Sequence, residues 1–152
     1  MRKPLGLFLA ALFSFSLSHA QNEPFEALPM VVFEMAAHNI YESETIGIAN
    51  AKSKQFARYQ QLVAKASEEQ LLELTDHNNA VVRLYAYQAL RQKGVSVSKS
   101  LQQKFKEDTT SVQSMQGCVI NKFPVSKLAA TPLSAKNYFS QQNFSAIQFV
   151  SQ

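Results

Sequence analysis

Residues 80–94, AVVRLYAYQALRQKG, are the stretch of sequence that decides the fold. The glycine that ends this stretch is a natural helix terminator, because glycine readily adopts the left-handed conformation that closes a helix. Within the predicted helix, Ala86 and Ala89 are small enough for a second helix to approach closely, while Val82 and Leu90 can fill the seam. The stretch therefore predicts a helix that packs tightly against its neighbours.

A shorter helix is predicted directly before this one. Ser67 can cap its first turn, and Leu71, Leu72 and Leu74 supply its apolar side. The polar sequence at 76–79 then forms a turn between the two helices. Residues 67–94 are thus predicted to form a helical hairpin.

This helical hairpin resembles a HEAT repeat. The family pattern is an apolar first helix, an acidic or amide turn, a Val-Arg step, small residues in the second helix and a closing leucine. The residues that carry the resemblance are Leu71, Leu72, Leu74, Asn79, Val82, Arg83, Ala86, Ala89 and Leu90. We interpret these residues as structural rather than catalytic. Arg83, directly after a core valine, is expected to reach turn carbonyls or carboxylates of an adjoining unit.

Other helices are predicted on both sides of the hairpin. Ser53 can cap a helix in which Phe56, Tyr59 and Leu62 recur at helical spacing, and Ser98 or Ser100 can begin a further helix. A repeat unit buries its apolar face only against its neighbours, so one match requires others.

We therefore predict three helical pairs, at about 30–65, 67–94 and 97–120. The predicted fold class is all-α, a short right-handed stack of HEAT-like helical hairpins. Its helical domain covers 21–120, and an irregular C-terminal arm with a possible short helix covers 121–152.

The start of the chain has the pattern of a secretory signal peptide. Arg2 and Lys3 precede an apolar run at 5–17, and Ser18-His19-Ala20 offers small side chains before a cleavage site. The run is shorter than the roughly 20 apolar residues that a membrane-spanning helix needs. We expect residues 1–20 to be removed and the protein to be exported to the periplasm or the exterior.

The charges of the chain are unevenly placed. All 11 acidic residues lie in the first 108 positions, whereas the remainder carries Lys122, Lys127 and Lys136. These lysines could contact an anionic surface, or they could simply be solvated. The sequence leaves both alternatives open.

Cys118 is the single cysteine, so no intramolecular disulfide can form. Small exported domains often depend on disulfides, so the apolar core must hold this fold instead. The sequence Gly117-Cys118-Val119-Ile120 around the cysteine is apolar and predicts a buried thiol of raised pKa. Such a thiol is poorly suited to nucleophilic chemistry.

Glu34, His38 and Glu42 are the candidate metal ligands. Their four-residue spacing would place all three on one face of a helix predicted over 30–44, and imidazole and carboxylate are common ligands. The same spacing fits a solvated polar stripe, and the sequence identifies no further ligand. Metal binding stays an alternative, and no cofactor is predicted.

The sequence contains no phosphate-binding glycine loop, nucleophile elbow or zinc-binding cysteine pair, which favours a protein without catalytic activity. We expect an exported interaction or scaffold module that offers a helical surface to a protein partner. One alternative is a small metal-binding protein or metal-dependent enzyme that uses the Glu/His/Glu set. The other is a cationic cell-envelope surface binder that uses the lysine-bearing tail. Neither a nucleic-acid partner nor a transmembrane segment is expected.

Overall fold

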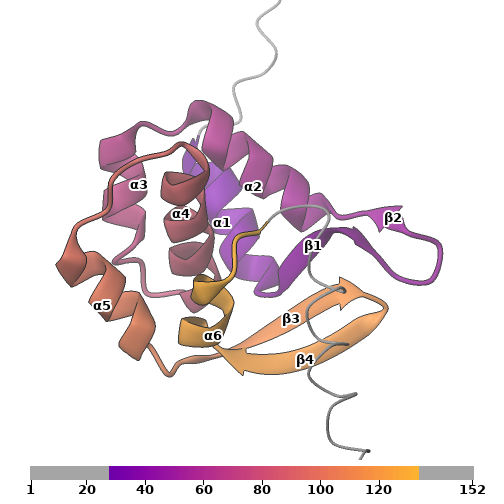
Figure 1. Ribbon diagram of the computed structural model, residues 1–152. Coiled ribbons are helices and arrows are strands. Elements are labelled where there is room, and N and C mark those ends of the chain that lie inside the picture. The colour runs from indigo at the N-terminus through magenta and orange to yellow at the C-terminus, as the bar shows by residue number, and fades with distance from the viewer. Residues whose placement is uncertain (1–27, 134–152) are drawn as a thin grey trace, which may run out of the picture.

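The computed structural model describes residues 28–133. The helices are α1 (Leu28–His38), α2 (Lys54–Lys65), α3 (Glu68–Leu74), α4 (Ala80–Gln92), α5 (Lys99–Glu107) and α6 (Val125–Ala130). The strands are β1 (Tyr41–Ile46), β2 (Ala51–Lys52), β3 (Ser111–Gly117) and β4 (Val119–Pro124). Helices and sheet form two adjoining parts of one α/β fold (Figure 1). The expected signal peptide at 1–20 lies outside the described residues.

The prediction of an all-α fold is wrong, because four strands form a mixed sheet. β1 lies where the first predicted helix was expected to end, and β3 and β4 replace the second helix of the third predicted pair. A HEAT-like stack of three helical hairpins is therefore excluded. The arm predicted at 121–152 is not irregular throughout, since β4 and α6 occupy its beginning.

Local sequence explains where helix gives way to strand. α1 ends at His38 because Asn39 adopts a left-handed conformation with φ of 53°, which asparagine tolerates better than most residues. In β3, buried Val112 and Ser114 alternate with exposed Ser111 and Gln113. This period of two is the burial pattern of a strand rather than a helix.

The strand order in the sheet is β2-β1-β3-β4. β1 and β3 are parallel neighbours, while β2 pairs antiparallel with β1 and β4 pairs antiparallel with β3. Gly117, the last residue of β3, and Cys118 form the turn to β4, and Gly117 has the positive φ (55°) that such a tight turn requires. The connection from β2 to β3 contains the four helices α2 to α5.

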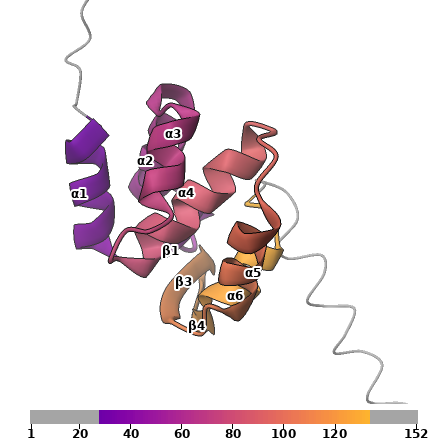
Figure 2. The same ribbon diagram turned by 90° about the vertical axis from the view of Figure 1, so that its left-hand side faces the viewer.

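Helix α4 is buried around its whole circumference. Its buried residues are Val81, Val82, Leu84, Tyr85, Ala86, Tyr87, Gln88, Ala89 and Leu90. It contacts α1, α2, α3, α6 and β3. Figure 2 shows α1, α2 and α3 on one side of α4 and α5 and α6 on the other. A helix without a solvated face has to be covered by other elements, so α4 organises the fold.

Helices α3 and α4 form the predicted local hairpin. Ser67 and Gln70 make a reciprocal capping box at the start of α3, and the Asn79 side chain accepts hydrogen bonds from two backbone N–H groups at the start of α4. Gly94, which follows the C-cap residue Lys93 of α4, has a φ of 71°. Side-chain caps and a left-handed glycine thus fix the ends of this hairpin.

The Tyr85 hydroxyl joins α4 to the sheet. It accepts a hydrogen bond from the backbone N–H of Glu42 (2.8 Å) and donates to the carbonyl oxygen of the same residue (3.2 Å). The Tyr85 ring lies against Tyr41 and Tyr59, at centroid distances of 4.8 and 5.3 Å. Burial raises the pKa of Tyr85 above its ordinary value, so the hydroxyl keeps its proton. A helix side chain therefore satisfies β1 backbone groups in the core.

Replacing Tyr85 with phenylalanine should leave the Glu42 N–H buried without this hydrogen bond. We expect Tyr85→Phe to lower the free energy of unfolding by about 1–3 kcal/mol in urea titrations. Tyr87→Phe is the matched control, because among residues 28–133 its hydroxyl makes no hydrogen bond to protein. Equal stability of the two variants would contradict the structural role of the Tyr85 hydroxyl.

A charge in the centre of α4 should unfold the protein. Ala86 is fully buried, so Ala86→Asp would place a carboxylate where no space or partner exists for it. We expect a loss of roughly 3 kcal/mol or more in thermal melts followed by circular dichroism. Ala57→Asp, at an exposed alanine of α2, is the control and should change stability by less than about 0.5 kcal/mol. A parent-like melt of Ala86→Asp would refute the central position of α4.

Candidate functional site

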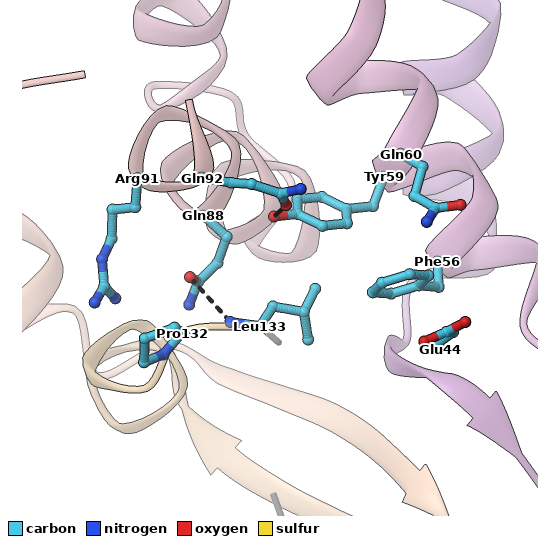
Figure 3. A pocket seen from close by; sticks show the side chains of 9 residues that line it. All are labelled: Glu44, Phe56, Tyr59, Gln60, Gln88, Arg91, Gln92, Pro132 and Leu133. Carbon is cyan, nitrogen blue, oxygen red and sulfur yellow. Dashed lines mark hydrogen bonds between the residues drawn. The ribbon is translucent and has the colours of Figure 1, made fainter. Parts of the chain in front are cut away.

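A pocket of about 490 Å³ opens beside α4, between α2 and the segment that follows α6 (Figure 3). Its lining residues are Glu44 from β1, Phe56, Tyr59 and Gln60 from α2, Gln88, Arg91 and Gln92 from α4, and Pro132 and Leu133. The volume falls within the roughly 300–1,000 Å³ of pockets that bind small ligands. This pocket is the candidate functional site.

One wall of the pocket is apolar. Phe56 and Tyr59 stand one helical turn apart on α2, and their ring centroids are 5.5 Å apart. Leu133 extends toward these rings from the segment after α6 (Figure 3). The spacing that makes α2 amphipathic therefore also supplies the aromatic wall.

Gln88 holds the segment that closes the pocket. Its amide nitrogen donates to the carbonyl oxygens of Leu128 (3.1 Å) and Thr131 (2.8 Å), and its amide oxygen accepts from the Leu133 N–H (3.4 Å). Gln88 is itself buried, so these bonds satisfy a polar side chain in the core. The Gln88 amide thus fixes residues 131–133 against α4.

Arg91 and Glu44 give the pocket a charge at each end (Figure 3). One guanidinium nitrogen of Arg91 donates to the carbonyl oxygen of Ala129 at 2.7 Å. A guanidinium has five N–H donors, so others can serve a ligand. The Glu44 carboxylate accepts from the Lys52 ammonium at 2.7 Å. The charges can orient a ligand along the pocket.

The Tyr59 hydroxyl donates to the amide oxygen of Gln92 at 2.5 Å. Burial raises the pKa of Tyr59 to about 12, although the positive charge of Arg91 opposes the shift. The phenol is therefore protonated at neutral pH. Because the Gln92 amide oxygen accepts this hydrogen bond, its amide nitrogen is the group that can donate to a ligand.

The described lining residues are suited to binding rather than to proton transfer. They include no serine, cysteine, histidine or lysine. Of the ionisable groups among them, Glu44 is in an ion pair and Tyr59 stays protonated. The pocket therefore offers an apolar wall, amides and fixed charges.

The residues that carry the HEAT resemblance lie in and around α3 and α4, and none of them lines the pocket. Leu71, Val82, Ala86, Ala89 and Leu90 are buried, Leu74 and Asn79 are half-buried, and Leu72 is 40% exposed. The sequence analysis did not identify the pocket, because it assigned no binding role to the polar residues of α4. Gln88 and Arg91, three positions apart on a helix with small and apolar neighbours, were the sequence feature that could have indicated a pocket.

Arg83 joins the turn before α4 to the segment before β3. One guanidinium nitrogen donates to the carbonyl oxygens of His77 and Asn78, both at 3.0 Å, and the other lies 2.9 Å from the Asp108 carboxylate. Burial alone would raise the pKa of Asp108, but hydrogen bonds from Thr110 and Arg83 lower it below its ordinary value. The arginine thus supports the structure between α4 and β3.

The helix face proposed for Glu34, His38 and Glu42 does not exist, because α1 ends at His38 and Glu42 lies in β1. Glu34 instead pairs with Arg58 at 2.8 Å. His38 Nε2 lies 2.7 Å from one Glu42 carboxylate oxygen, and the other accepts from the Ser53 hydroxyl at 2.5 Å. Across residues 28–133, no three His, Cys, Asp or Glu side chains are arranged to hold a metal ion.

The prediction of a buried cysteine is wrong. Cys118 is exposed in the turn between β3 and β4. The apolar neighbours that suggested burial, Val119 and Ile120, are themselves exposed at the start of β4. Apolar sequence at this hairpin marks a surface rather than the core.

The lysines of the predicted cationic tail are in different surroundings. Lys122 is exposed on β4, and the Lys127 ammonium lies 4.3 Å from the centroid of the Phe123 ring. Lys136 lies outside the described residues. Within the part of the chain that the structure describes, none of the helices has the length and apolar character needed to cross a membrane.

No protein-family model and no curated protein matches this chain. Its function must therefore be inferred from its own residues. The pocket beside α4 is the feature that carries this inference furthest.

The raised pKa of Tyr59 predicts a change in stability at high pH. A group whose pKa is raised on folding stabilises the fold below its unfolded pKa of 10.0, and this contribution is lost as pH rises toward about 12. Urea titrations between these pH values should show a smaller loss of stability for Tyr59→Phe than for the parent chain. If the free energy of unfolding falls equally with pH for the parent and Tyr59→Phe, the raised pKa of Tyr59 is contradicted.

Proposed function

We propose that the protein is a non-enzymatic interaction module whose pocket binds an extended segment of a protein partner. The supporting observation is the combination of an aromatic wall, at Phe56 and Tyr59, with amide groups at Gln60 and Gln92. A peptide has both side chains to bury and backbone groups that need hydrogen bonds, so it matches a pocket of this composition.

The charges at the ends of the pocket support a directional mode of binding. A segment with an acidic group near Arg91 and a basic group near Glu44 would be favoured over the reversed orientation. Since Glu44 already pairs with Lys52, Arg91 is the stronger determinant. We infer that the bound segment places a carboxylate beside Arg91.

We also propose that the protein acts outside the cytoplasm. The charged start, short apolar run and small-residue exit of residues 1–20 support this location. The mass of the protein recovered from cells tests the proposal, because processing after Ala20 leaves Gln21 as the first residue. Recovery of an unprocessed cytoplasmic chain would refute export.

Site-directed photo-crosslinking tests the pocket. A benzophenone amino acid at Gln60, an exposed lining residue, should capture a defined partner peptide in the native compartment. The same amino acid at exposed Lys106 of α5, which does not line the pocket, is the positional control. Adding Leu133→Asp to the Gln60 probe should lower the yield about tenfold or more, because it places a charge on the apolar wall.

The crosslinking variants must first melt like the parent chain, so that lost capture reports on binding. Equal yields at Gln60 and Lys106 would contradict the proposal. So would an unchanged yield when Leu133→Asp is added to the Gln60 probe. Mapping the crosslinked peptide by mass spectrometry then tests the expected carboxylate, which should lie on the side of Arg91.

A further inference from the structure

Three exposed aliphatic residues lie at one end of the sheet, in or beside two neighbouring turns. Ile48 is 94% exposed in the turn between β1 and β2, and Val119 and Ile120 are 46% and 53% exposed where β4 begins. We call these three residues the tip surface. None of them lines the pocket. Exposed apolar side chains concentrated at one end of a molecule are a sign of a contact surface.

The turns that carry the tip surface are fixed to each other. The Gly47 N–H donates to the carbonyl oxygen of Gly117 at 2.8 Å, and the Gly117 N–H donates to the Ser43 hydroxyl at 3.2 Å. Figure 1 shows the β1–β2 and β3–β4 turns at the same side of the molecule. Because these bonds already order the backbone, a contact made by both turns loses little conformational freedom.

The charged groups behind the turns are Lys122 and the ion pair of Lys52 with Glu44. Residues 45–53 and 109–133 contain no acidic side chain. Lys122 is exposed about 10 Å along β4 from the turn, and it makes no ion pair within the described residues. Lys52, also exposed, follows the other turn and pairs with Glu44. The aliphatic residues of the tip surface thus lie at the end of the sheet, and the lysines follow them along the strands.

We propose that the tip surface docks on an anionic lipid bilayer. The interface of such a bilayer has the complementary order, with anionic headgroups above an apolar layer. Ile48, Val119 and Ile120 enter the boundary between headgroups and acyl chains, and Lys122 and Lys52 contact the headgroups. Contact through two turns leaves the helices facing away from the membrane, so this peripheral contact is compatible with a partner in the pocket.

Vesicle co-sedimentation tests this docking. The protein is isolated from cells, and its first residue is identified by mass spectrometry. It is mixed with vesicles of phosphatidylcholine that contain roughly one third phosphatidylglycerol. The triple substitution Ile48→Ser, Val119→Ser and Ile120→Ser should reduce partitioning by about tenfold or more. The matched control is Phe33→Ser, which removes a 67% exposed apolar side chain of α1 and should bind like the parent.

The electrostatic part of the contact has its own controls. Pure phosphatidylcholine vesicles, high salt, and the pair Lys52→Gln and Lys122→Gln should each weaken binding. A nitrobenzoxadiazole label on Cys118, the single cysteine and exposed beside the tip surface, should shift its emission to the blue when anionic vesicles are added.

Three outcomes would overturn the proposal. The first is absence of binding to anionic vesicles, and the second is equal binding of the parent and the triple variant. The third is a change in the sedimentation coefficient of the triple variant without lipid, which would assign the tip surface to contact between copies of the chain. All substituted residues are exposed, so thermal melts of the variants should match the parent.

Discussion

The burial of α4 on every side is the constraint on which the structure depends. A helix in this position presents polar groups to the core as well as apolar ones, and each buried polar group needs a partner. Tyr85 finds its partner in β1, and Gln88 finds its partners in α6 and the segment after it. The apolar side chains of α4 bring the other elements together, while these two side chains specify where the sheet and the last helix attach.

The pocket is a product of the same arrangement. Beside α6, the covering segment at 131–133 is held against α4 by hydrogen bonds with Gln88. Space therefore remains between this segment and the aromatic residues of α2. The polar groups that hold the wall and the apolar groups that line it come from residues far apart in sequence, which is common in binding pockets formed where several elements meet.

Sequence patterns predicted α2 to α5, but they missed the sheet and α6 and extended the first helix into β1. Serine caps at Ser53, Ser67 and Ser98 are present, because capping depends on residues a few positions apart. β1 escaped detection because its buried residues are Tyr41 and Glu42, adjacent in sequence rather than alternating. Ser53 and His38 form hydrogen bonds with the buried Glu42 carboxylate. The Glu42 backbone is satisfied by Tyr85, which is 43 positions away in the sequence. The pocket depends on contacts of similar span, which local periodicity does not encode.

The parallel pairing of β1 with β3 also determines the order in which the chain can fold. The N-terminal strand has only the two-residue β2 beside it until β3 has been synthesised, after all of α2 to α5. Closing so long a connection is slow compared with forming local helices, since distant contacts form only after a large loss of chain entropy. A ribosome-bound fragment that stops before β3 therefore lacks the parallel pairing of β1 and the strand β4. Under the export proposed above, the sheet would stay incomplete until β3 has followed the helices through the translocation channel.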